Sequence, residues 1–62
     1  MEKKKLKEIR IEQGLKANYV AEAIGMKPAT LSRKENGLRR FTITEAQALC
    51  KLYKVNMKDI AE

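Results

Sequence analysis

The side chains best suited to chemistry in this sequence lie in one short basic stretch, "KPATLSRKENGLRR", which covers residues 27–40. The stretch carries five basic residues and one acidic residue. The guanidinium of Arg33 is a forked donor that can bond to O6 and N7 of guanine at the same time. These side chains are suited to binding a polyanion rather than to making or breaking covalent bonds.

The sequence offers little for catalysis. It contains no His and one Cys, Cys50, so one chain cannot assemble a His base, a disulfide or a Cys/His zinc site. Its Glu and Lys residues form no recognisable acid/base group, and a chain this short buries only about 60% of its unfolded surface. We expect a protein that is not an enzyme and has no metal, cofactor or evident small-molecule ligand. Because Cys50 falls on an apolar helical stripe, we expect it to be an inert core thiol.

Positive charge is concentrated in two parts of the chain. The net charge is +6, with six basic and three acidic residues in positions 1–16, five and one in 27–40, and three and three in 41–62. A localised basic face favours a polyanionic partner, of which nucleic acid is the commonest. The apolar runs are far shorter than the ~20 residues that cross a bilayer, and the first residues do not resemble a signal peptide. We therefore expect a cytoplasmic protein without a membrane partner.

Glycines mark the ends of the first three predicted helices. Gly14, Gly25 and Gly37 each follow a segment of helical periodicity, and glycine is favoured just after the last helical turn. The sequence has no period-2 strand pattern, so the predicted fold class is all-α. The three helices are expected over about residues 3–13, 17–24 and 28–36.

Two further start signals follow. Thr42 and Glu45 have the spacing of a capping box, which predicts the start of a fourth helix. Asn56 and Asp59 repeat that spacing and predict a last short helix. The apolar stripe of the fourth helix comprises Ile43, Ala46, Leu49, Cys50 and Tyr53.

The third predicted helix has a single apolar anchor, Leu31. At about 100° per residue, burial of Leu31 turns the opposite face of the helix outward. Small side chains on that face let the helix approach a surface closely, with Pro28 and Ala29 against thymine methyl groups and Ser32 on a base or a phosphate. The outward face comprises Ala29, Ser32, Arg33 and Asn36.

A more specific pattern comes from the order and spacing of six residues, Val20, Ala21, Ile24, Gly25, Met26 and Leu31. It resembles the helix-turn-helix of the phage Cro and repressor family, also called the xenobiotic-response-element (XRE) type. The resemblance extends from Leu6 to Ile60. It implies a single DNA-binding domain over residues 1–62, folded as a compact bundle of five helices of the lambda-repressor-like type. The second and third helices form the helix-turn-helix.

The resemblance also implies roles for individual residues. An ion pair between Arg10 and Glu35 is expected as part of the architecture. Contacts to base edges are implied for Lys27, Pro28, Ala29, Ser32 and Arg33. Contacts to the DNA backbone are implied for Lys16, Asn18, Asn36, Arg39 and Arg40.

Four positions depart from the family pattern. Lys16 and Lys27 stand where a Ser or Thr cap is usual, which costs about 0.5–2 kcal/mol at each helix start. Ala17 replaces a polar residue that commonly holds a phosphate. Lys34 occupies a usually apolar place, so we expect its stem to lie along the rim of the core and the recognition helix to sit more loosely.

The implied function is sequence-specific DNA binding by a Cro/repressor-like transcription regulator of bacterial or phage type, which obstructs or recruits polymerase. It would place helix 28–36 in the major groove of an operator, with two copies on a palindrome. The alternative is a helix-turn-helix that binds another protein, as an antirepressor does. RNA binding is a further alternative, for which the sequence lacks an aromatic stacking platform.

Several side chains keep two interpretations. The run Lys3 to Lys5 is either an arm on the DNA backbone or a solvated tail. Tyr19 either meets a phosphate or is a half-buried aromatic. Ile11 and Leu52 fall off the apolar stripes and suggest an exposed surface for a dimer contact.

Overall fold

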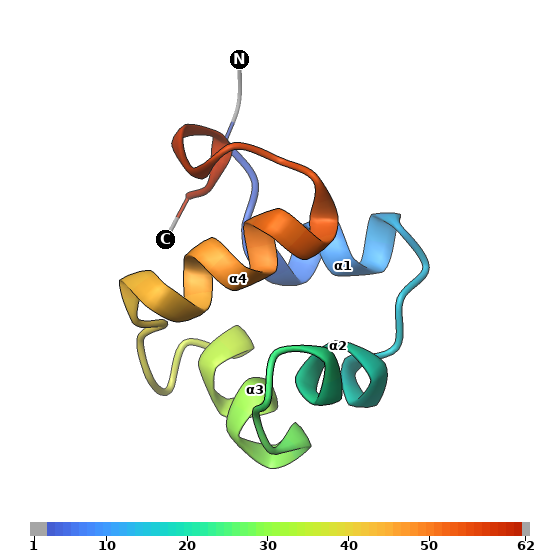
Figure 1. Cartoon of the computed structure of the whole chain (residues 1–62). Coiled ribbons are helices and arrows are strands. Elements are labelled where there is room, and N and C mark those ends of the chain that lie inside the picture. The colour runs from blue at the N-terminus through green and yellow to red at the C-terminus, as the bar shows by residue number, and fades with distance from the viewer. Residues whose placement is uncertain (1–2, 62) are drawn as a thin grey trace.

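The computed structural model describes residues 3–61, and over that range it contains four α-helices and one short 3₁₀ helix (Figure 1). In Figure 1, α1 and α4 form one half of the molecule and α2 and α3 form the other, and η1 lies beyond α4. The prediction of an all-α fold is confirmed. The elements are α1 (Leu6–Glu12), α2 (Ala17–Ala23), α3 (Pro28–Glu35), α4 (Ile43–Tyr53) and η1 (Met57–Asp59).

The expected fifth α-helix is not formed, and the prediction of a five-helix bundle is wrong in this respect. The segment η1 is a single 3₁₀ turn, and Asn56 makes no side-chain capping bond to it. Ile60 has extended backbone and forms a parallel bridge with Lys4. In this bridge the Lys4 N–H donates to the Asp59 carbonyl at 3.1 Å, and the Ala61 N–H donates to the Lys4 carbonyl at 2.9 Å. Pairing with the N-terminal segment therefore uses the backbone that another helical turn would need.

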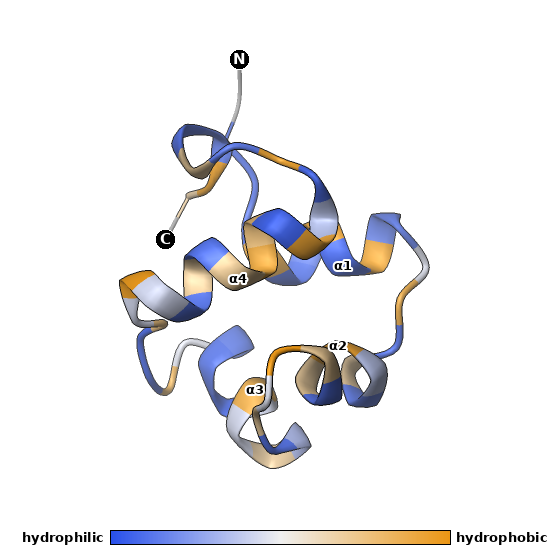
Figure 2. Ribbon diagram, viewed as in Figure 1, coloured by the Kyte–Doolittle hydropathy of each residue, from blue (hydrophilic) through white to orange (hydrophobic). Residues whose placement is uncertain are grey.

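All four α-helices contribute to one apolar core. Polar and apolar bands follow one another along α3 and α4 in Figure 2, as expected of amphipathic helices. From α3 only Leu31 is buried, and it is fully enclosed, as the sequence predicts. The core comprises Leu6, Ile9, Val20, Ala21, Leu31, Ala46, Leu49, Cys50, Tyr53 and Ile60.

The helix starts differ in quality. Neither Lys16 before α2 nor Lys27 before α3 makes a side-chain capping bond. At α4 the predicted capping box is present, because Thr42 Oγ1 accepts from the Glu45 N–H at 3.1 Å and Glu45 Oε1 accepts from the Thr42 N–H at 2.9 Å. The weakly capped starts of α2 and α3 thus depend on tertiary packing.

The helix ends differ as well. The first three α-helices are each followed by a glycine with positive φ, as the sequence predicts. After α4 the same left-handed position is occupied by Lys54, with φ of 60° and ψ of 45°. A side chain at this position costs more conformational free energy than glycine does, since Cβ approaches the following carbonyl oxygen.

Among residues 3–61, no helix has the length and apolar character needed to cross a membrane.

Candidate nucleic-acid interface

The outer face of α3 is polar and exposed. Leu31 is fully buried beneath it, and the side chains of Lys34 and Glu35 at the end of the helix also turn inward. Five residues were predicted to contact base edges, and the structure exposes all five on α3 or directly before it. These are Lys27, Pro28, Ala29, Ser32 and Arg33.

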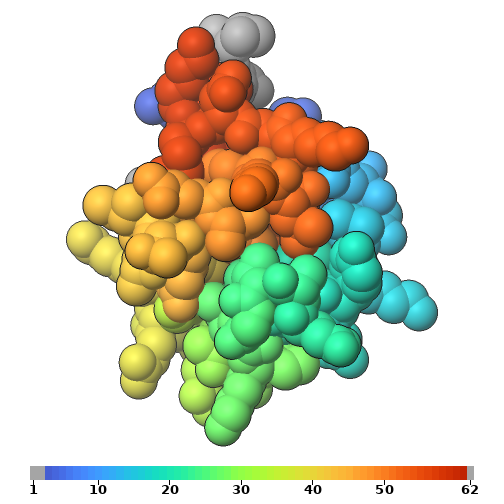
Figure 3. Space-filling view, in the orientation of Figure 1, coloured from blue at the N-terminus to red at the C-terminus, as the bar shows by residue number. Residues whose placement is uncertain are grey.

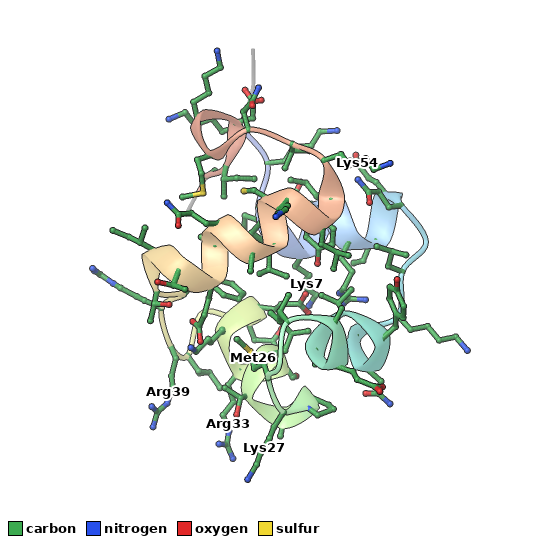
Figure 4. All side chains as sticks on the ribbon, viewed as in Figure 1. Lys7, Met26, Lys27, Arg33, Arg39 and Lys54 are labelled. Carbon is green, nitrogen blue, oxygen red and sulfur yellow. The ribbon has the colours of Figure 1, made fainter. Side chains whose placement is uncertain are left out.

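The cations around α3 point in a common direction. In Figure 4, Lys27, Arg33 and Arg39 project from the same end of the molecule, away from α1 and α4. Figure 3 shows that this end is built from α3 and the segments before and after it, and that η1 lies at the other end. Among the residues that the structure describes, no salt bridge involves Lys27, Arg33, Arg39 or Arg40. Their positive charges are therefore free to meet an anionic partner.

The predicted backbone-contacting residues flank this face. Lys16 and Asn18 lie at the start of α2, which packs against α3. Asn36, Arg39 and Arg40 follow the end of α3. All five are exposed, so the candidates from both helices belong to the same half of the molecule.

The Arg10–Glu35 pair is nearly buried and bidentate. Arg10 Nε donates to Glu35 Oε2 at 2.8 Å, and Nη2 donates to Oε1 at 3.1 Å. The side chains are 13% and 4% exposed. The third nitrogen, Nη1, donates to the Leu15 carbonyl at 2.9 Å. The hydrogen bond with Glu35 raises the pKa of Arg10, so its guanidinium stays protonated. Through its three hydrogen bonds, Arg10 connects α1 with the loop after it and with the end of α3.

Tyr53 lies next to this pair and has a structural role. Burial, together with the charge of Glu35, raises the pKa of Tyr53 to about 12. Its hydroxyl is enclosed and has no hydrogen-bond partner within residues 3–61. Its carbonyl accepts from Gln13 Nε2 at 2.8 Å, which connects the ends of α1 and α4. Tyr53 thus belongs to the core, as its place on the apolar stripe predicts.

Lys34 holds α3 rather than loosening it. Its Nζ lies 2.5 Å from Glu45 Oε1, and the two side chains are 11% and 27% exposed. The bond from Lys34, followed by the bond from the Thr42 N–H, lowers the pKa of Glu45. Glu45 therefore caps α4 and binds the end of α3 with the same carboxylate.

Lys7 is a residue of this region that sequence reasoning missed. Its Nζ donates to Asn36 Oδ1 at 3.0 Å, and Asn36 Nδ2 donates to Ser32 Oγ at 3.4 Å. A signal for it existed, because Lys7 precedes Arg10 by three residues and shares its face of α1. The partners of the two cations, Glu35 and Asn36, are consecutive at the end of α3.

The remaining candidates are placed as follows. Lys4 Nζ donates to both oxygens of Glu12, at 2.9 and 2.7 Å, so the lysine run is held against α1 at its centre. Tyr19 is 56% exposed and Ile11 is 58% exposed. Leu52 is partly buried against the core, so the prediction that it belongs to an exposed apolar surface is wrong.

Cys50 is enclosed in the core, 4% exposed, with its Sγ 3.5 Å from Met57 Sδ. Burial, followed by the charge of Asp59, raises the pKa of the Cys50 thiol. Little of the reactive thiolate therefore forms at neutral pH.

No group of three His, Cys, Asp or Glu side chains within residues 3–61 is arranged to hold a metal ion.

The comparison with protein families agrees with this architecture. The model of the helix-turn-helix family HTH_3 matches residues 6–60, which is nearly the whole chain. The chain matches no curated protein and no solved structure. The family match covers all four α-helices and confirms the resemblance found in the sequence. The chain belongs to the HTH_3 helix-turn-helix family, the XRE type to which the Cro and repressor DNA-binding domains belong.

Proposed function

We propose that this protein is a sequence-specific DNA-binding transcription regulator with a Cro/repressor-like domain, which occupies an operator with α3 in the major groove. The observation that carries the proposal is the set of unpaired cations around α3, on a helix whose far side is anchored in the core. Its mechanism is binding that obstructs or recruits polymerase, with no covalent chemistry. It acts in the cytoplasm, on the chromosome of a bacterium or a phage.

The two groups of residues have different tasks. Arg33 pairs with guanine, Pro28 and Ala29 contact thymine methyl groups, and Lys27 and Ser32 bond to neighbouring base edges. Lys16, Asn18, Asn36, Arg39 and Arg40 bind phosphates, which fixes the position of α3 in the groove. Because phosphate contacts release counterions, affinity should fall steeply as salt rises.

Two copies on a palindromic operator would provide selectivity that one copy lacks. Half-sites one helical turn apart have centres separated by about 34 Å. The principal-axis extents of the molecule, 31, 22 and 18 Å, do not exceed this spacing. The exposed apolar residues Leu38 and Ile43, 74% and 72% exposed, lie in the loop after α3 and at the start of α4.

The test is selection from randomised duplex DNA, with the bound fraction sequenced. Arg33→Ala should cost about 1–3 kcal/mol and relax the preference at one base pair, whereas Arg39→Ala should weaken binding to all sequences alike. Equal losses on specific and random duplexes would remove Arg33 from base recognition. If the wild-type protein enriches no sequence and its binding does not depend on salt, the function is instead protein binding of the antirepressor kind.

A further inference from the structure

Three side chains form a hydrogen-bonded chain from α1 to the outer face of α3. Lys7 Nζ lies 3.0 Å from Asn36 Oδ1, and Asn36 Nδ2 lies 3.4 Å from Ser32 Oγ. In Figure 4, Lys7 lies between α1 and the half of the molecule that α2 and α3 form. The chain ends at Ser32, which is exposed on the proposed DNA-binding face.

The direction of every bond in this chain is fixed by Lys7. An ammonium group has three donors and no acceptor, so only the amide oxygen of Asn36 can face it. The amide nitrogen of Asn36 must then face Ser32, and it can only donate. Ser32 Oγ is therefore the acceptor in its bond with Asn36.

The hydroxyl hydrogen of Ser32 remains for an external acceptor. A helical serine can donate to the carbonyl four residues earlier, but within the described chain the Ser32 hydroxyl has no acceptor. Its oxygen already accepts from Asn36, so the hydroxyl hydrogen is the part of this group that no described residue satisfies.

The backbone at the end of α3, which carries Asn36, is held by hydrogen bonds to neighbouring residues. The Asn36 N–H donates to the Ser32 carbonyl at 3.0 Å, and the Gly37 N–H donates to the Lys34 carbonyl at 3.2 Å. The preceding residue, Glu35, is held by Arg10 through two bonds. The position of Asn36 is therefore fixed by its backbone. Lys7 determines which way its amide group is turned, with Oδ1 toward Lys7 and Nδ2 toward Ser32.

We infer that Lys7 is a positioning residue that, through Asn36, makes Ser32 an outward hydrogen-bond donor and thereby sets the base preference at one position of the operator. The inference rests on the proposed function. In the major groove, guanine, adenine and thymine each present an acceptor, while cytosine presents its amino donor. Ser32 should therefore discriminate against cytosine on the strand that it faces.

The experiment is the same selection from randomised duplex DNA, carried out in parallel on the wild-type protein and four variants. Ser32→Ala identifies the base pair that Ser32 reads. At that position the wild type should disfavour cytosine by about tenfold, the effect of one hydrogen bond gained against one donor left unpaired. Lys7→Met should reduce this discrimination to that of Ser32→Ala. Asn36→Asp puts a carboxylate oxygen, which only accepts, against Ser32 Oγ, so it should shift the preference toward cytosine. Lys7→Arg, which keeps a pure donor, should restore the discrimination against cytosine.

Lys16→Met is the matched control for loss of a positive charge, since Lys16 is exposed and belongs to the proposed phosphate contacts. It should weaken binding to all sequences and leave the preference at the Ser32 position unchanged. A purely electrostatic or structural role of Lys7 would give the same result as Lys16→Met.

The outcomes separate this inference from the proposed function. Enrichment by the wild type, with an unchanged preference in Lys7→Met, overturns the role of Lys7 alone. If Ser32→Ala loses no base preference, the inference is overturned and Ser32 is removed from base recognition, while sequence-specific binding through the other residues of α3 stands. Enrichment of no sequence by the wild type overturns the proposed function and the inference with it.

Discussion

Replacing Arg10 by methionine should destabilise the protein severely. The substitution keeps an apolar stem of similar length and removes three hydrogen bonds, two to Glu35 and one to the Leu15 carbonyl. The carboxylate of Glu35, 4% exposed, is then left without its cation. Loss of one partner from a buried pair costs about 3–5 kcal/mol, because the other charge stays buried.

That loss is large against the stability available. At 0.05–0.15 kcal/mol per residue, a domain of this size has a free energy of unfolding of about 3–9 kcal/mol. Arg10→Met should therefore remove a third or more of the free energy of unfolding, and at the lower end of this range it leaves a large part of the population unfolded at 25 °C. The measurement is urea unfolding followed by far-ultraviolet circular dichroism.

A double variant and a surface control make the reasoning testable. Arg10→Met with Glu35→Met removes both charges, so it should be more stable than Arg10→Met alone. Glu12→Gln breaks a pair whose side chains, Lys4 and Glu12, are 50% and 53% exposed, and should cost about 0–1 kcal/mol. If Arg10→Met costs no more than Glu12→Gln, the argument that the nearly buried Arg10–Glu35 pair stabilises the fold is refuted.

The other predictions concern α4 and its ends. Lys54→Gly should raise the free energy of unfolding by about 1 kcal/mol, because Lys54 holds a left-handed conformation at φ 60°. Lys54→Ala should give no such gain, and an equal gain from both would exclude backbone strain as the cause. Hydrogen bonds from Lys34 and Thr42 lower the pKa of Glu45 below its ordinary value of 4.5. As pH falls, Glu45 is therefore protonated in the unfolded chain before it is protonated in the folded one. The stability that ionised Glu45 contributes is fully present above pH 4.5 and is lost as pH falls through the folded pKa. The cost of Glu45→Gln in urea unfolding should thus shrink below about pH 4.5, and a cost independent of pH would contradict this.

Features of the fold that depend on neighbouring residues could be predicted from the sequence. The capping box of Thr42 and Glu45 and the glycines after the first three helices are local, since the groups that interact are a few residues apart. Leu31 could be predicted as the anchor of α3 because it is the single apolar residue at an inward position. The family pattern then gave the arrangement of the helices, which periodicity alone does not provide.

Features that depend on distant pairing could not be predicted. The start signal at Asn56 is correct in spacing, but the bridge between Lys4 and Ile60 limits η1 to one turn. Lys34 looked unfavourable in its apolar position because the carboxylate of Glu45 meets it only in the folded structure. The same holds for Lys7, whose partner Asn36 lies 29 residues along the chain.

The basic residues around α3 fall into two groups with opposite tasks. Leu31 is the single buried residue of this helix, so apolar contact alone holds it at one point. Lys7, Arg10 and Lys34 supply the rest, through three consecutive positions at its end, residues 34–36. The cations at Lys27, Arg33, Arg39 and Arg40 make no salt bridge within residues 3–61.

This division explains how a helix with one core side chain can present a defined surface. Salt screens exposed charges strongly and nearly buried pairs much less. The support of α3 through Arg10 and Glu35 therefore persists at ionic strengths that weaken attraction between its outer face and an anionic partner. Fold and binding face thus respond separately to salt, although both are built from the same kinds of basic side chain.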